Sequence, residues 1–276
     1  MIQERAFEVN GLSLRTFFAG SGQEHLLFLH GWGCDAGTMQ SLASPKLMAD
    51  YCCVFMDFPG FGKTPAPPEA WGIDEYAGFT ATFIRMMSPE KPVSVVAHSF
   101  GARVLLKLLA APETADLFNK VVITGGAGMK PRRGLSYYYK TSLARLLKAP
   151  FVLLPASQRE KAHQWLRKTA VWKSLGSSEY SSLEGVMQGV FVKTVREYLE
   201  PCLPEISHEV LLMWGENDEA TPLYQGQRIE QGLVNGHLVS LPDAGHYAFL
   251  DQPARFRAVL NAYLVADETT SEKAAE

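Results

Sequence analysis

Short apolar runs recur along this chain, and none of them alternates between apolar and polar residues. They are residues 26–29, 52–56, 93–97, 121–123 and 210–214. A strand that is apolar at every position has no side suited to water, so each run fits a β-strand covered on both faces. Stretches with helical spacing lie between several runs, including residues 73–87 and residues 102–111, where Pro112 ends the pattern. Strand followed by helix, repeated, predicts an α/β fold with a parallel sheet and helices on both faces.

The strand pattern is interrupted in the middle of the chain and resumes at residues 210–214. Residues 128–203 have the character of helices separated by prolines and glycines. They are therefore predicted to form a helical cap inserted into a core domain made of residues 1–127 and 204–266. The polar tail, residues 267–276, is expected to fray. Near the other end, an Asn-Gly pair at positions 10 and 11 between two alternating runs predicts a β-hairpin.

Charge and hydropathy exclude several classes of protein. The chain has 26 Lys and Arg against 29 Asp and Glu, a net charge of −3, so it lacks the basic charge of a dedicated nucleic-acid binder. No apolar run reaches the ~18 residues of a membrane span. The N-terminus also lacks a secretory signal pattern. We therefore expect a cytoplasmic protein with no transmembrane segment and no nucleic-acid partner.

The basic residues are concentrated in the predicted cap. Residues 130–173 contain eleven Lys and Arg and one acidic residue, Glu160. This segment is either a solvated face or a surface that attracts an anionic substrate, an acidic partner protein or a membrane. Residues 140–148 fit an amphipathic surface helix that could dock on lipid. The aromatic residues at 137–139, 165 and 172 either line a pocket or pack against the core.

The cysteines do not indicate a metal site or a disulfide framework. The four residues include no C-x-x-C pair and are too sparse for either role. We interpret them as small buried thiols. No metal and no cofactor is predicted from the sequence. The four cysteines are Cys34, Cys52, Cys53 and Cys202.

A serine lies where one buried run meets a helical pattern. The run 93–97 leads directly into Ala-His-Ser-Phe-Gly (97–101), with Ser99 at its centre. A sharp strand-to-helix turn brings backbone and side chains very close, so it needs small residues two positions before and after the serine. Ala97 and Gly101 meet that need. The pattern is a nucleophile elbow with alanine in place of the first glycine, and it makes Ser99 the candidate nucleophile.

Two backbone amides are candidates for an oxyanion hole. One is the N–H of Phe100, because the helix that follows Ser99 directs its first amides and its positive end toward a developing negative charge. The other is the N–H of Trp32, in the His-Gly-Trp-Gly loop (30–33) that follows the first apolar run. Glycines there allow the backbone to fold back toward the site.

A base and an acid for Ser99 follow two later strands. The run 210–214 leads into an acidic loop that ends at Asp218, and a short strand at 237–240 precedes the loop that contains His246. A serine needs an imidazole to take its proton, and the imidazole needs a carboxylate to fix its tautomer and stabilise its charged form. Asp218 and His246 are therefore the candidate acid and base.

The chain contains five short motifs that resemble those of the α/β-hydrolase superfamily. In that superfamily the nucleophile, the acid and the histidine follow one another along the chain in the order seen here for Ser99, Asp218 and His246. The resemblance covers nearly the whole chain. It implies an eight-stranded, mostly parallel sheet, a helical cap inserted after the sixth strand and a cofactor-free hydrolytic site. Ser rather than Asp at position 99 argues against the haloalkane dehalogenase and epoxide hydrolase branches. The motifs lie at residues 30–33, 57–62, 97–101, 214–218 and 245–246.

Other polar residues near the motifs have simpler interpretations. His98 is expected to point into the scaffold and pack there. Asp57 is expected to hold a loop by accepting backbone hydrogen bonds. Glu216 competes with Asp218 because it lies in the same loop. Structural or surface roles are expected for the remaining histidines that we weighed: His25, His163, His208 and His237.

The resemblance and the candidate residues together predict a serine hydrolase. The expected substrate is a carboxylic ester, or a related acyl compound, of a small and partly apolar molecule, cleaved through an acyl-enzyme. A carbon–carbon bond hydrolase or a lyase-type member using the same three residues is the first alternative. A binding module that docks an acidic partner through the basic cap is the alternative from another class.

Overall fold

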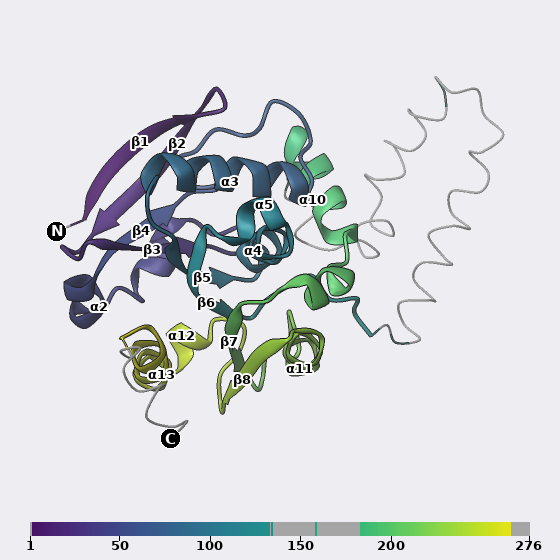
Figure 1. Ribbon diagram of the computed structural model, residues 1–276. Coiled ribbons are helices and arrows are strands. Elements are labelled where there is room, and N and C mark those ends of the chain that lie inside the picture. Colours follow the sequence, from purple (N-terminus) through teal and green to yellow (C-terminus); the bar gives the residue numbers. More distant parts are fainter. Residues whose placement is uncertain (1, 133, 135–157, 159–182, 266–276) are drawn as a thin grey trace.

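The structure is a computed structural model that describes residues 2–132, 134, 158 and 183–265 (Figure 1). Several sequence predictions lie outside these residues: the aromatic residues at 137–139, 165 and 172, the amphipathic stretch 140–148 and the tail. Of the basic side chains between residues 130 and 173, only Lys130 and Arg132 are described. The cap boundaries at 128 and 203 therefore remain a prediction.

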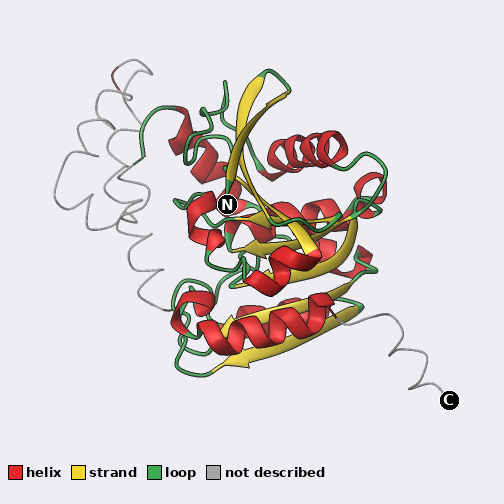
Figure 2. Ribbon diagram, turned by 90° about the vertical axis from the view of Figure 1, so that its left-hand side faces the viewer, coloured by secondary structure: helices red, strands yellow, loops and turns green. Residues whose placement is uncertain are grey.

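A mostly parallel sheet of eight strands forms the centre of the described chain (Figures 1 and 2). Its order is β1-β2-β4-β3-β5-β6-β7-β8. β1 is antiparallel to β2, and β2 is antiparallel to β4, whereas the remaining neighbours are parallel. All five apolar runs lie in strands, which confirms the predicted parallel sheet. The strands are β1 Gln3–Val9, β2 Leu12–Ala19, β3 Glu24–Leu29, β4 Tyr51–Met56, β5 Val93–His98, β6 Phe118–Thr124, β7 Glu209–Gly215 and β8 Asn235–Leu241.

The predicted hairpin joins β1 to β2. Asn10 and Gly11 have φ angles of 49° and 80°, in the left-handed region that asparagine and glycine tolerate best. Positive φ at both central residues is the requirement of the two-residue turn that matches the twist of a hairpin. The Asn-Gly pair is therefore the local cause of this turn.

Helices cover both faces of the sheet (Figures 1 and 2). Helices α3, α4 and α11 contribute to the apolar cluster on one face, and α1, α2, α12 and α13 contribute to the cluster on the other. The helical patterns at residues 73–87 and 102–111 correspond to α3 and α4. The bounds are α1 Ala36–Gln40, α2 Pro45–Asp50, α3 Ile73–Met87, α4 Phe100–Ala110, α5 Pro112–Ala115, α10 Val186–Arg196, α11 Leu223–Gly232, α12 Ala248–Asp251 and α13 Pro253–Val265.

Strand β3 shows why the apolar runs do not alternate. Leu27 and Leu29 belong to the cluster beneath α3 and α4, whereas Leu26 and Phe28 belong to the opposite cluster. All four side chains are fully buried. Successive side chains of a strand point to opposite faces, so a sheet with helices on both sides requires apolar residues at every position.

The segment between β6 and β7 contains α10 and a 3₁₀ helix, η2 Glu200–Glu205. This places the insertion after the sixth strand in chain order, as the resemblance implied. Leu199 and Leu203 are buried in the core cluster that includes α4. The guanidinium of Arg103 on α4 also donates to the backbone oxygens of Thr194 and Glu197. The residues from α10 to η2 therefore contact α4 directly.

The cysteines depart from the sequence prediction. Only Cys53 is buried, and burial raises the pKa of its thiol to about 12. Cys34, Cys52 and Cys202 are half-buried. Cys52 and Cys202 pack against a core cluster without being enclosed by it, and Cys34 lies in the loop after β3. The expectation of four buried thiols was thus wrong for three of them. In the described residues no three His, Cys, Asp or Glu side chains form a group that could hold a metal ion.

None of the helices described by the structure is both long enough and apolar enough to cross a membrane.

Candidate active site

Ser99 occupies a sharp turn between β5 and α4. Its φ and ψ angles are 50° and −104°, a conformation that costs a non-glycine residue about 1–3 kcal/mol. The turn also brings α4 very close to β3, because a Cβ added to Gly101 would lie 2.4 Å from the carbonyl oxygen of Leu29. No side chain fits there. The glycine two positions after Ser99 is therefore a steric requirement of the turn, as predicted.

The loop after β3 passes directly over this turn. A Cβ on Gly31 would lie 2.9 Å from Cδ2 of His98 and 3.2 Å from Cβ of Ser99. The loop is held by His30, whose Nδ1–H donates to the carbonyl of Gly31 at 2.8 Å. Nε2 of His30 accepts from the N–H of Phe58 at 3.0 Å. His30 is thus a buried structural histidine that joins two loops at the site.

The two predicted oxyanion donors border the same space as Ser99. Trp32, Phe100, Ser99 and His246 all line one cavity of about 490 Å³. In the described part of the chain, neither the N–H of Trp32 nor that of Phe100 has a hydrogen-bond acceptor. Backbone donors left without a partner beside a cavity are suited to binding an anionic oxygen.

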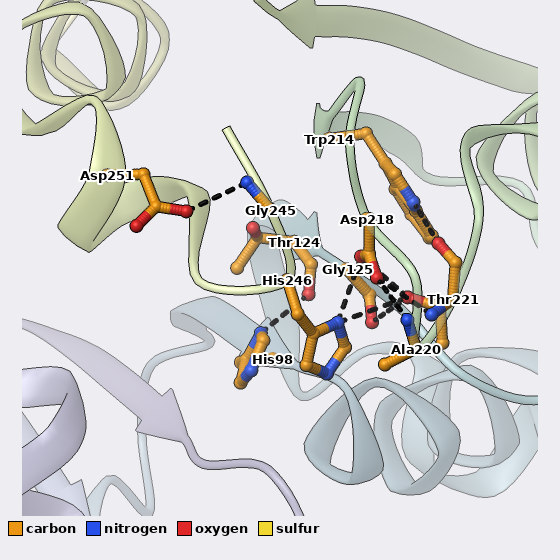
Figure 3. A network of polar contacts seen from close by, with 10 residues as sticks. All are labelled: His98, Thr124, Gly125, Trp214, Asp218, Ala220, Thr221, Gly245, His246 and Asp251. Atoms are coloured by element: carbon orange, nitrogen blue, oxygen red, sulfur yellow. Dashed lines mark hydrogen bonds and ion pairs between the residues drawn. The ribbon is translucent and has the colours of Figure 1, made fainter. Parts of the chain in front are cut away.

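His246 and Asp218 are brought together by the loops that follow β8 and β7. The N–H of Asn217 donates to the carbonyl of Ala244 at 2.9 Å and joins the two loops. Nδ1–H of His246 donates to Oδ2 of Asp218 at 2.9 Å (Figure 3). Asp251 on α12 also accepts from the N–H of Gly245, the residue before His246. Loop pairing therefore fixes the position of the imidazole relative to the carboxylate.

Asp218 is surrounded by hydrogen-bond donors. Its Oδ1 accepts from the N–H groups of Ala220 and Thr221, at 2.9 and 2.8 Å. Its Oδ2 lies 2.9 Å from the hydroxyl oxygen of Thr221, which is also 3.0 Å from the carbonyl oxygen of Gly125 and 3.3 Å from Nδ1 of His246. Figure 3 shows Thr221 beside both members of the pair. Thr221 was not singled out from the sequence.

The pKa of Asp218 reflects a competition between burial and these donors. Burial by itself raises the pKa, but the hydrogen bond and charge of His246 and the bonds from Thr221 lower it more. The net result is a pKa below the ordinary value of an aspartic acid. Asp218 is therefore a carboxylate at neutral pH, which is the form that stabilises a protonated His246.

The other acidic residues and histidines that were weighed from the sequence lie outside the His246–Asp218 pair. Asp57 accepts from the backbone N–H groups of Ala36 and Lys63, at 2.7 and 2.8 Å, which confirms its role in holding loops. Glu216 accepts from the hydroxyl of Ser240 at the surface, whereas Asp218 holds His246. His25, His208 and His237 lie away from the described lining of the cavity, and His163 lies outside the described residues.

His98 packs behind His246, as expected from the sequence. It is fully buried, and its ring centroid lies 4.7 Å from that of His246. Its Nδ1–H donates to the carbonyl of Thr124 at 3.0 Å (Figure 3). Within the described chain Nε2 has no partner. Burial, followed by the positive charge of a protonated His246, lowers the pKa of His98 to about 3, so the ring is neutral in the folded protein.

The low pKa of His98 predicts a loss of stability in acid. The unfolded chain takes up this proton near pH 6.5, whereas the folded chain takes it up only near pH 3. The free energy of unfolding should therefore fall by about 1.4 kcal/mol for each pH unit between these values. His98→Asn, which keeps a donor for Thr124, should flatten the slope in urea unfolding measured from pH 4 to 7. The exposed variant His237→Asn is the matched control, and equal slopes for wild type and His98→Asn would contradict this account.

Known proteins share both the sequence pattern and the fold. The alpha/beta hydrolase family model matches residues 26–259. The chain is 28% identical over 261 residues to the dihydrolipoyllysine-residue acetyltransferase component of an acetoin cleaving system from Cupriavidus necator. That alignment covers 93% of this chain and 68% of the relative.

Two solved structures resemble the fold closely. An esterase from Exiguobacterium antarcticum has a TM-score of 0.71 and 19% identity, and the match covers 96% of this chain and 100% of the esterase. A 2-hydroxy-6-oxo-6-phenylhexa-2,4-dienoate hydrolase from Rhodococcus has a TM-score of 0.70 and 21% identity, with coverage of 96% and 99%. Together with the family match over most of the chain, these likenesses lead to one conclusion: the chain belongs to the alpha/beta hydrolase family.

Proposed function

We propose that this protein is a serine hydrolase that cleaves a carboxylic ester of a small, partly apolar substrate. The observation that carries the proposal is the meeting of three features at one cavity. Ser99 lies there on a strained turn, and the His246–Asp218 pair borders the same space. The residues that carry two backbone N–H groups, for which the described chain offers no acceptor, also line it. Each feature supplies one requirement of acyl transfer.

In the proposed mechanism Ser99 Oγ attacks the acyl carbon while Nε2 of His246 takes its proton. The carbonyl oxygen becomes an oxyanion that the N–H groups of Trp32 and Phe100 stabilise, each donor typically contributing ~10²–10³ in rate. Asp218 keeps Nδ1 protonated, so that Nε2 is free to act as the base. His246 then protonates the leaving alcohol. Water, activated by the same imidazole, hydrolyses the acyl-enzyme and restores Ser99.

A carbon–carbon bond hydrolase is the second candidate, because one of the similar structures is described as a dienoate hydrolase. The same serine and histidine could serve that reaction. We place the ester first because the fold is equally similar to that of an esterase. The cavity is consistent with an acyl substrate of modest size, since Trp32, Phe100 and Phe191 provide an apolar wall.

The test is hydrolysis of 4-nitrophenyl esters with acyl chains of two to eight carbons, followed by product analysis. We expect release of nitrophenol and the free acid, with the preferred chain length set by the cavity. A fluorophosphonate probe should block the activity, and mass spectrometry should locate its label on Ser99. If the protein does not hydrolyse these esters but cleaves a vinylogous 1,5-diketone into two carbon fragments, the result would favour a carbon–carbon bond hydrolase instead. A labelled residue other than Ser99 would overturn the assigned nucleophile.

A further inference from the structure

Among the described residues, one permanently charged cationic side chain lines the cavity beside Ser99. Arg103 lies on α4 four residues after Ser99, which corresponds to about 6 Å along the helix axis. Residues four apart lie on the same side of a helix. Arg103 therefore borders the cavity one helical turn beyond the candidate nucleophile.

The hydrogen bonds of Arg103 occupy only part of its guanidinium group. Nη1 donates to the carbonyl oxygens of Thr194 and Glu197, at 2.9 and 2.8 Å. Nε and Nη2 have no acceptor among the described residues. These two nitrogens form one edge of the planar group, the edge that can donate two parallel hydrogen bonds to a carboxylate. The unoccupied edge thus has the geometry of an anion-binding fork.

Within the described chain Arg103 forms no direct ion pair, although the nearby charge of Glu197 favours its protonated form. Its hydrogen-bond acceptors are uncharged carbonyl groups, and the nearby Glu197 carboxylate is paired with Lys107 at 3.2 Å. Lys107 pairs in addition with Asp74 at 2.8 Å. Burial lowers the pKa of Arg103 to about 10, so the group is still charged at neutral pH. A half-buried cation whose nearest carboxylate is shared with Lys107 is only partly compensated, and a negatively charged ligand would complete the compensation.

We infer that Arg103 binds a carboxylate of the substrate, so that the preferred ester carries an anionic group a few carbons from the acyl carbon. This inference rests on the proposed function and narrows its substrate class. The apolar wall of Trp32, Phe100 and Phe191 suits the short hydrocarbon chain between the two ends. Arg103 is then a specificity-determining residue. The competing interpretation is structural, because Nη1 also ties α4 to α10 and the residues after it.

A matched pair of substrates separates the two interpretations. Mono-4-nitrophenyl adipate and 4-nitrophenyl hexanoate have six-carbon acyl chains that differ only in a terminal carboxylate or methyl group. In Arg103→Met the ratio of kcat/KM for adipate over hexanoate should fall by about tenfold to a hundredfold, the usual effect of losing a charge-assisted hydrogen bond. Arg103→Lys should retain part of the preference. Equal losses for both esters would show that Arg103 acts only as a tether and would overturn the inference.

Lys107→Met is the control variant. It removes a positive charge from the same helix and breaks a contact to Glu197, yet Lys107 is already neutralised by two carboxylates. We expect its substrate ratio to stay within about twofold of the wild type. A drop as large as that of Arg103→Met would attribute the preference to general charge around α4 and would contradict a specific site.

Two further measurements do not depend on the folding of Arg103→Met or on ester chemistry. In the wild type, the adipate preference should weaken as ionic strength rises, and a strong preference for hexanoate would overturn the inference. If no Ser99-dependent ester hydrolysis is found, the proposed function fails on its own. Calorimetry with adipic and hexanoic acids then tests Arg103 directly. Tighter binding of adipic acid by the wild type, weakened but not abolished in Arg103→Lys, would support the site, and equal binding of both acids by the wild type would overturn it.

Discussion

Replacing Ser99 by alanine should lower kcat/KM for the preferred ester by about 10⁴- to 10⁶-fold while leaving the fold unchanged. The substitution removes the oxygen that is proposed to attack the acyl carbon, and neither His246 nor the backbone N–H groups can replace it. Alanine adopts the same turn with one atom fewer, so packing around the elbow is kept. The measurement is ester hydrolysis together with circular dichroism and urea unfolding, which verify that the variant is folded.

Ser94→Ala is the matched control for this prediction. Ser94 is buried in β5, the strand that leads to Ser99, but it lies outside the described lining of the cavity. We expect this variant to keep its activity within about threefold, as for a change that touches no reacting group. Substantial activity in folded Ser99→Ala would rule out a covalent mechanism at this residue. A comparable loss in both variants would point to a general disturbance of β5.

Replacing Asp218 by asparagine should lower kcat/KM by about 10⁴-fold. Oδ1 accepts from the N–H groups of Ala220 and Thr221, so the amide oxygen of asparagine must take that position. The amide nitrogen then faces Nδ1 of His246, where two donors would meet. The imidazole is driven to the tautomer with Nε2 protonated. Such a histidine cannot accept the proton of Ser99.

The neighbouring acid provides the control for Asp218→Asn. Glu216 lies in the same loop but hydrogen-bonds with Ser240 at the surface. Glu216→Gln is expected to change kcat/KM by less than about threefold. The two variants should be compared by steady-state ester hydrolysis at neutral pH. A larger loss in Glu216→Gln than in Asp218→Asn would make Glu216 the acid and would require a different orientation of His246.

Much of the fold could be predicted because its signals are local. The runs at residues 26–29 and 93–97 are apolar at every position, and the strands β3 and β5 are buried on both faces as this pattern requires. The turn at Ser99 could also be predicted, because it needs small residues at fixed distances from the serine. Gly101 shows the reason directly, since a side chain there would collide with β3.

The polar contacts around the candidate site could not be predicted in the same way. Thr221 contacts Gly125 only because β6 and β7 are neighbours in the sheet. Arg103 lies one turn after Ser99, a spacing that was visible in the sequence, but its unoccupied edge depends on where Thr194 and Glu197 lie. Contacts between distant segments, and the exposure of Cys34, Cys52 and Cys202, require the packed structure.

The division of the candidate site between the two halves of the chain has a consequence for biosynthesis. Ser99 follows β5, whereas Asp218 and His246 follow β7 and β8, which come after the insertion. In a growing polypeptide, Ser99 and the two candidate oxyanion donors are therefore translated long before the proposed base. The nascent protein would thus carry a nucleophile that cannot be activated. Under the proposed mechanism, hydrolytic competence would arrive only after β7 has paired with β6 and β8 with β7, late in synthesis.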